Sequence, residues 1–216
     1  LLRVSPEAPA EPMSSFIERL RDLLESGQNL PTLPEVVLLL HAAIDDEMVD
    51  VESVAEIIER DPALTARLLR VANSAYYFRG GDPIGSVPGA VGRLGLGQVR
   101  ALCLALGVVR GFGMGGGALD YRAFWAHSAA VGMTAYRLWI LAGGTGPVSA
   151  DDIYAAGLMH DIGILVLDQH FPAELRAARA IAEKEGIQLW RAEETVIGMD
   201  HGEVGALLLG RWKLPP

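Results

Sequence analysis

Residues 155–167 read AAGLMHDIGILVL, and this run decides the fold that we expect. It is apolar except at one point, where His160 and Asp161 stand side by side. Folding would remove both groups from water, and burial of an uncompensated charge costs free energy. Each of the two therefore needs a hydrogen bond, a charged partner or a metal ion.

The residues before this run predict the helix that carries it. Ser149 and Asp152 have the spacing of a capping box, so a helix should begin near Ala150. Successive residues on a helix point about 100° apart. His160 and Asp161 would therefore reach one ion only from the edge of the helix, and other helices would have to supply further ligands.

Composition limits the class of protein. The chain has 216 residues, half of them hydrophobic, which suits one large domain or two small ones with a well-buried core. Its net charge of −9 argues against non-specific binding to nucleic acid or to anionic membranes, so we expect neither as a partner. The first residues show no signal-peptide pattern, and arginines interrupt the longest apolar stretches, so no membrane span is expected.

The single cysteine, Cys103, lies in the apolar run ALCLALGVV. We expect a buried hydrophobic side chain there rather than a reactive thiol. One cysteine cannot form a disulfide framework within the chain, which fits a reducing compartment. We therefore predict a cytoplasmic location.

Apolar residues recur at helical spacing along the chain, and no alternating strand pattern of any length occurs. The sequence predicts an all-helical fold, with a linker or disordered lead over residues 1–12 and one domain over 13–216. The glycine-rich segment 113–120 divides that domain into an N-terminal helical part, 13–117, and a second helical part, 118–216. Within the second part, the almost wholly apolar helix over residues 124–143 should lie centrally.

Residues 87–112 should form two helices broken near Gly95, and this pair has two interpretations. A helix-turn-helix would use Arg93 and Arg100 to contact phosphate. Ordinary packing between helices is the alternative. We favour packing because the second helix is too apolar over residues 102–109 to lie in a groove of DNA.

Four residues are of the types that bind divalent metals, and they fall in three expected helices: His127, His160, Asp161 and His201. The sequence alone leaves open whether they converge on one metal site or form a hydrogen-bonded polar cluster in the core. A metal at such a site would be Fe, Mn, Mg or Zn. We assign no catalytic residue and no other cofactor.

The motif HDIG after an apolar helix resembles the HD superfamily of metal-dependent phosphohydrolases. A longer series of motifs, in order over about residues 30–215, resembles the HDOD domain, a bacterial signalling and output module related to that superfamily. The motifs are LPTLPEVVLLL, IIERDPALTARLLRVANSAYY, AVGRLGLGQVRALCLAL, FWAHS, AAGLMHDIGILVL and DHGEVGALLLGRWKLP.

This resemblance implies an HD-like helical bundle with an N-terminal helical subdomain. It also implies a regulatory role beside receiver, GGDEF, EAL or similar signalling partners. It places His127 at the first metal histidine, His160 and Asp161 at the dyad, and His201 at the histidine before the G-x-x-L-L helix. One departure counts against phosphate binding: HD-GYP phosphodiesterases carry a lysine directly after HDIG, where this chain has Ile164.

Three functions remain open on this basis. We favour a signal-transduction output module without catalytic turnover, which relays signals through protein–protein contacts and has a homodimer as one candidate assembly. The second is a metal-dependent phosphohydrolase or phosphodiesterase that acts on nucleotides or cyclic dinucleotides. The third is a metal or ligand sensor that uses the same residues without turnover.

Overall fold

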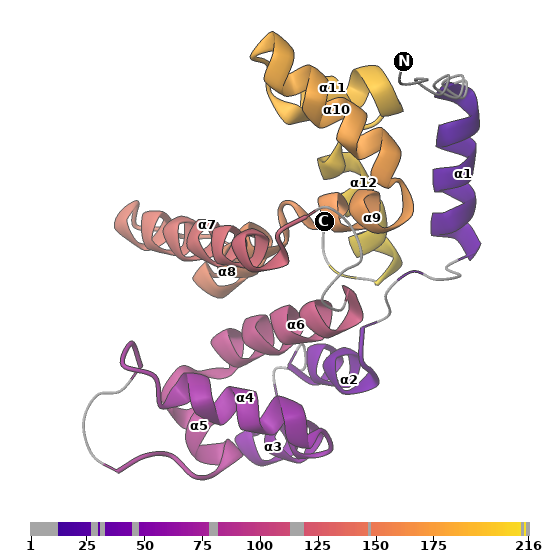
Figure 1. Ribbon diagram of the computed structural model, residues 1–216. Coiled ribbons are helices and arrows are strands. Elements are labelled where there is room, and N and C mark those ends of the chain that lie inside the picture. Colours follow the sequence, from indigo (N-terminus) through magenta and orange to yellow (C-terminus); the bar gives the residue numbers. More distant parts are fainter. Residues whose placement is uncertain are drawn as a thin grey trace, which may run out of the picture. The chain divides into compact units, whose positions relative to one another are not determined.

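The computed structural model describes residues 13–26, 30, 33–44, 48–77, 82–112, 119–146, 148–212 and 214. Every regular element in these ranges is an α-helix, which confirms the all-helical prediction (Figure 1). The predicted lead and residues 113–118 of the glycine-rich segment lie outside the described residues. No single described helix is long and apolar enough to cross a membrane. The neighbouring helices Val87–Leu94 and Leu96–Phe112 meet the length and composition criteria only as a pair, and that pair is bent by 112°.

The chain divides into two compact units. Unit 1 comprises Leu1–Leu30 and Asp161–Pro216, and unit 2 comprises Pro31–His160. The helices of unit 2 are α2 (Glu35–Ile44), α3 (Val51–Glu59), α4 (Pro62–Ala72), α5 (Val87–Leu94), α6 (Leu96–Phe112), α7 (Tyr121–Leu141) and α8 (Ala150–Met159). Those of unit 1 are α1 (Met13–Ser26), α9 (Ile162–His170), α10 (Pro172–Glu185), α11 (Leu189–Ile197) and α12 (His201–Arg211).

Helices of unit 2 begin at residues whose side chains cap them. The Asp50 carboxylate accepts a hydrogen bond from the backbone N–H of Ser53 at 2.7 Å, and Asp61 and Ser86 cap α4 and α5 in the same way. Such caps satisfy N–H groups that have no partner within the helix. Gly95, with φ of 83°, separates α5 from α6, so the expected pair of helices is present.

The core of unit 2 is built from apolar side chains of α3 to α6, among them Val54, Ile58, Leu68 and Val99, which are fully buried. Cys103 is also fully buried, as predicted. Burial disfavours the thiolate and raises the pKa of the Cys103 thiol to about 12.

Helix α7 does not lie centrally, so that prediction was wrong. Its buried residues are Tyr121, Phe124, Ser128 and Gly132, which form a single stripe. This stripe includes the contact with α8, the helix on which α7 chiefly packs, and the two run side by side in Figure 1. Because one neighbour covers one stripe, apolar residues elsewhere on α7 stay exposed, with Leu141 82% exposed.

Helix α9 is the central helix of unit 1. Every residue from Ile162 to Asp168 is buried, and α10 and α12 both pack on this helix. Helices α10 and α11 lie side by side and end at glycines in the left-handed region, Gly186 and Gly198, with φ of 65° and 82° (Figure 1).

The two units of the structure do not meet at residue 117, where the sequence placed the boundary between the two helical parts. Helix α8 packs on α6 as well as on α7, which keeps both α7 and α8 with the preceding helices. Helix α1 packs on α11 and α12, so the start of the chain belongs with its end. The boundary thus falls at the peptide bond between His160 and Asp161, inside the motif.

Candidate functional site

The apolar run is interrupted at the HD motif, whereas the sequence predicted one helix through it. Helix α8 ends at Met159 and α9 begins at Ile162, with His160 and Asp161 in the turn between them. The expected desolvation fails for His160, which is exposed, while Asp161 is half-buried. The apolar residues before the turn are buried in the core of unit 2, and those after it are buried in the core of unit 1. His160 and Asp161 therefore lie at the boundary between the two units in the sequence.

The capping box at the start of α8 is present as predicted. The Ser149 hydroxyl accepts a hydrogen bond from the backbone N–H of Asp152 at 3.1 Å, and the Asp152 carboxylate accepts one from the N–H of Ser149 at 3.0 Å. This fixes where α8 begins, and its ten residues then end just before the motif.

In unit 2, two glycines bring α7 and α8 into backbone contact. A Cβ atom on Gly157 would lie 2.8 Å from the Cα of Gly132, and one on Gly132 would lie 2.8 Å from the carbonyl oxygen of Tyr154. Real side chains do not tolerate such distances, so only glycine permits this approach. The close packing brings the His127 ring to the His160 ring, with 5.4 Å between their centroids.

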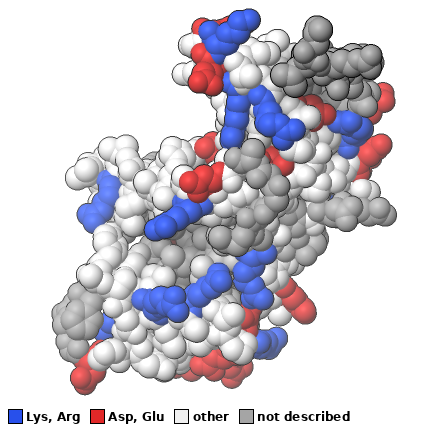
Figure 2. All heavy atoms as spheres, viewed as in Figure 1, with Lys and Arg blue, Asp and Glu red and all other residues white. Residues whose placement is uncertain are grey.

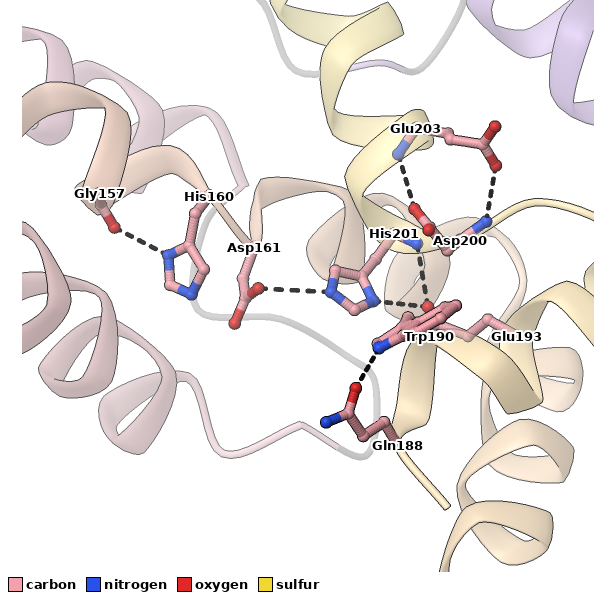
Figure 3. A network of polar contacts seen from close by, with 9 residues as sticks. All are labelled: Gly157, His160, Asp161, Gln188, Trp190, Glu193, Asp200, His201 and Glu203. Atoms are coloured by element: carbon pink, nitrogen blue, oxygen red, sulfur yellow. Dashed lines mark hydrogen bonds and ion pairs between the residues drawn. The ribbon is translucent and has the colours of Figure 1, made fainter. Parts of the chain in front are cut away.

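The hydrogen bonding of His160 suits a metal ligand. Its Nδ1 lies 2.8 Å from the carbonyl oxygen of Gly157 (Figure 3). A carbonyl oxygen only accepts, so Nδ1 carries the proton and Nε2 holds the lone pair that a metal requires. With His127, and with Asp161 as the next residue in the chain, this makes the one possible His/Asp metal-binding group in the described part of the protein. Two imidazoles and a carboxylate fit the divalent metals expected from the sequence.

In unit 1, the start of α12 positions His201. The Asp200 carboxylate accepts a hydrogen bond from the backbone N–H of Glu203 at 2.9 Å, and the Glu203 carboxylate accepts one from the N–H of Asp200 at 3.1 Å (Figure 3). This capping box makes His201 the first residue of α12.

The glycine of the HDIG motif allows α12 to pack against α9. A Cβ atom on Gly163 would lie 1.9 Å from the carbonyl oxygen of His201 and 2.7 Å from the backbone nitrogen of Gly205. The two helices therefore touch through their backbones. This contact is what brings His201 beside Asp161, two residues before Gly163 in the chain.

His201 lies between two carboxylates in unit 1 (Figure 3). Its Nδ1 and its backbone N–H both donate to the same oxygen of Glu193, at 2.5 Å and 2.9 Å. Its Nε2 lies 3.4 Å from Oδ1 of Asp161. Glu193 is fully buried, and the side chains of His201 and Asp161 are each 18% exposed. One histidine thus joins a buried carboxylate to the carboxylate of the motif.

Burial alone would disfavour the charged imidazole of His201. Hydrogen bonds to Asp161 and Glu193, with attraction to both negative charges, outweigh burial and raise the pKa of His201 to about 10. At neutral pH both ring nitrogens therefore carry protons. A protonated nitrogen has no lone pair for a metal, so His201 in this form is a cation that pairs with Asp161.

Glu193 is not among the site residues that the sequence predicts. One signal was present: Glu193 stands four residues before Ile197 and next to Ala192, and both of these are fully buried. A carboxylate on the core face of an amphipathic helix needs a buried partner. No spacing in the sequence identified His201 as that partner.

The four predicted ligands occupy two pairs, His127 with His160 in unit 2 and Asp161 with His201 in unit 1. The peptide bond between His160 and Asp161 joins the pairs. Ile164, at the position of the HD-GYP lysine, is buried in α9. Metal binding by the four residues stays a prediction.

Comparison with known proteins gives solved structures with the same fold. An HDOD domain protein with unknown function from Geobacter sulfurreducens is 32% identical, with a TM-score of 0.75 over 92% of this chain and 67% of that one. A protein named "Putative phosphohydrolase" from Shewanella amazonensis is 30% identical, with a TM-score of 0.75 over 91% of this chain and 67% of that one. A protein named "Putative signal transduction protein" from Marinobacter aquaeolei, 24% identical, shares the fold with a TM-score of 0.75 over 97% of this chain and 49% of that one.

A curated relative, an uncharacterized protein of Treponema pallidum, is 26% identical over 187 residues. That match covers 87% of this chain, which spans about a third, 36%, of the relative. The family model of the HDOD domain matches residues 30–216. With the helical fold and the motif geometry described above, this match over most of the sequence shows that the chain belongs to the HDOD domain family.

Proposed function

We propose that this chain is a signal-transduction output module that works without catalytic turnover and relays signals through contacts with other proteins. The partners would be signalling proteins or attached receiver, GGDEF or EAL-type domains in the cytoplasm. The observation that carries this proposal is the ion-pair chain Glu193–His201–Asp161.

In this series of ion pairs, the Asp161 carboxylate, which would bind a catalytic metal, faces the positive charge of His201. A cation within a few ångströms favours the ionised carboxylate but also competes with a metal for its oxygens. His201, the fourth predicted ligand, has both nitrogens directed at carboxylates. The ion pair between Asp161 and His201 therefore stabilises the packing of α9 on α12, a role that needs no metal.

The residue after the motif supports the same proposal. A phosphohydrolase needs positive groups to bind its substrate, because the phosphate carries negative charge in the ground state and in the transition state. Ile164 is 7% exposed and lies in the core of unit 1, so its position supplies no such group.

One observation favours a second candidate, a metal-dependent phosphohydrolase or a metal sensor. The His127–His160 pair, with the lone pair of His160 on Nε2, fits a divalent metal, and Asp161 adjoins it in the chain. The solved structure named "Putative phosphohydrolase" has related sequence and fold. A bound metal would supply a Lewis acid, while these residues would hold and orient it.

Metal analysis and a hydrolysis assay separate the candidates. The purified protein is analysed for metal, then assayed with Mn²⁺ or Fe²⁺ against a panel of phosphodiesters, including cyclic dinucleotides. His160→Ala and Asp161→Ala are compared with His170→Gln, a control at a histidine of α9 outside the site. We expect no turnover.

The other outcomes are equally clear. Turnover that is lost in both site variants and kept in the control would establish the phosphohydrolase and overturn our proposal. Stoichiometric metal without turnover, lost in His160→Ala, would instead identify a sensor.

A further inference from the structure

A cleft in unit 2 lies outside the candidate site. It has a volume of about 410 Å³ and lies between the start of α2, the turn from α3 to α4 and the end of α6. Its walls include four apolar residues, Pro34, Val36, Leu39 and Pro62. Sites for small ligands have volumes of roughly 300–1,000 Å³ and combine apolar walls with a few polar groups. The size and the walls of this cleft therefore suit a small organic molecule, which would cover Leu39, now 39% exposed.

The packing of α6 on α2 brings Arg110 to the cleft (Figure 1). A Cβ atom on Gly107 would lie 2.9 Å from Cγ2 of Val37 and 3.2 Å from Cδ of Pro34, so glycine permits a close contact here. Arg110 follows Gly107 by three residues and projects on the same side of α6. Its guanidinium pairs with the Asp61 carboxylate, which connects α6 to the turn between α3 and α4. Contacts among these helices thus hold the walls of the cleft in place.

Four charged residues line the cleft, and two of them neutralise each other. One oxygen of Asp61 caps α4 through backbone hydrogen bonds of 2.9 Å and 3.1 Å, and the other pairs with Arg110. The remaining two, Glu35 and Arg60, are exposed, and their side chains make no hydrogen bond or ion pair to any residue that the structure describes. The cleft therefore presents one negative and one positive group that a ligand can reach.

This pair of charges determines the kind of ligand. The four charges of the lining sum to zero, so a simple anion attracted by Arg60 would be repelled by Glu35, and a simple cation would meet the reverse. The phosphate of a nucleotide would meet the same repulsion from Glu35. Figure 2 shows both basic and acidic side chains over α2–α6, in its lower half, so charge of one sign does not cover this surface. A ligand that carries both charges gains both attractions.

We propose that the cleft binds a small zwitterion with an apolar side chain, the class to which the free α-amino acids belong. The ligand carboxylate contacts the Arg60 guanidinium, whose parallel N–H donors match the two oxygens of a carboxylate. The ligand ammonium contacts the Glu35 carboxylate, and the apolar side chain packs on Leu39 and the prolines. Because the cleft is open to water, the dissociation constant is on the order of millimolar. Binding here uses no residue of the HD motif and does not depend on the output function proposed above.

Titration of the full chain with leucine, followed by nuclear magnetic resonance of the backbone amides, tests this proposal. We expect saturable shifts with leucine. Two analogues each lack one charge: 3-methylbutylamine has no carboxylate, and 4-methylpentanoate has no ammonium. Each should bind about 10-fold more weakly, because one charged group of the cleft loses its partner. AMP tests for a phosphate site and should also bind more weakly than leucine. If any of these three compounds binds as tightly as leucine, the proposal is wrong.

Two variants identify the groups that hold the ligand. Arg60→Gln and Glu35→Gln should each weaken leucine binding by about 10-fold. Arg60→Gln should bind leucine no better than 3-methylbutylamine, and Glu35→Gln should bind it no better than 4-methylpentanoate. Arg67→Gln and Glu52→Gln are the matched controls, at exposed positions of α4 and α3 outside the cleft, and should bind leucine like the wild type. Circular dichroism checks that all four variants fold. The absence of saturable shifts with leucine, or equal weakening in the controls, would overturn the proposal.

Discussion

A single methyl group added at Gly163 should separate α9 from α12 and remove His201 from Asp161. The Cβ of Gly163→Ala would lie 1.9 Å from the His201 carbonyl oxygen, where ordinary contact needs 3.4 Å or more. Both atoms nearest to it belong to the backbone, so no rotamer change relieves the overlap. The helices must move apart by about 1.5 Å. The distance from His201 to Asp161, now 3.4 Å, would then exceed the range of an ion pair.

The free energy of unfolding should fall by about 3 kcal/mol. Overpacking contributes roughly 1–3 kcal/mol, and the weakened hydrogen bonds of His201 contribute about 1 kcal/mol. The better helix propensity of alanine offsets up to about 1 kcal/mol of this loss. Urea unfolding followed by circular dichroism measures the change.

Gly210→Ala is the matched control for this prediction. Gly210 lies on the exposed side of α12, and a Cβ there would have no atom within 4 Å. The same substitution should leave stability unchanged or raise it by up to about 1 kcal/mol. If Gly163→Ala unfolds at the same urea concentration as the wild type, the backbone contact between α9 and α12 does not position His201, and our reasoning is wrong.

Three further predictions concern the ion-pair chain and the buried thiol. The pKa of His201 rises from 6.5 to about 10 on folding, so the ion pairs of His201 stabilise the protein fully below pH 6.5 and lose this effect as the pH rises toward 10. Glu193→Gln should flatten the dependence of the melting temperature on pH over this range. An unchanged profile would contradict the role of Glu193 as the partner of charged His201. Asp161→Ala leaves the charged His201 without one partner, which should cost about 1–3 kcal/mol in urea unfolding; unchanged melting would show that Asp161 has no structural role. Cys103 should react with a thiol reagent only at the rate of global unfolding, so rapid labelling of the folded protein would contradict its burial.

The sequence was sufficient to predict the class of fold and the start of α8. Ser149 caps α8 where expected, because a cap is a local interaction between a side chain and the next turn of its own helix. Local chemistry of this kind is visible in a few consecutive residues.

The break at the motif could not be predicted in the same way. Between Leu158 and Leu165 only Gly163 has a lower helix propensity than the HD pair itself, and the apolar run continues on both sides of the turn. The chain breaks there because Leu158 and Met159 enter the core of unit 2 while Ile162 and Leu165 enter that of unit 1. Which core buries each of these residues depends on helices that are distant in the sequence.

The helix break also gives two neighbouring residues opposite electrostatic surroundings. His160 follows the last turn of α8, where carbonyl groups that have no backbone partner within the helix carry a partial negative charge of about half an electron. Asp161 precedes the first turn of α9, whose N–H groups carry a similar positive charge, and its side chain makes no capping hydrogen bond to them. A cation is therefore favoured at the His160 end of α8 and an anion at the first turn of α9. A continuous helix through the motif would offer neither preference.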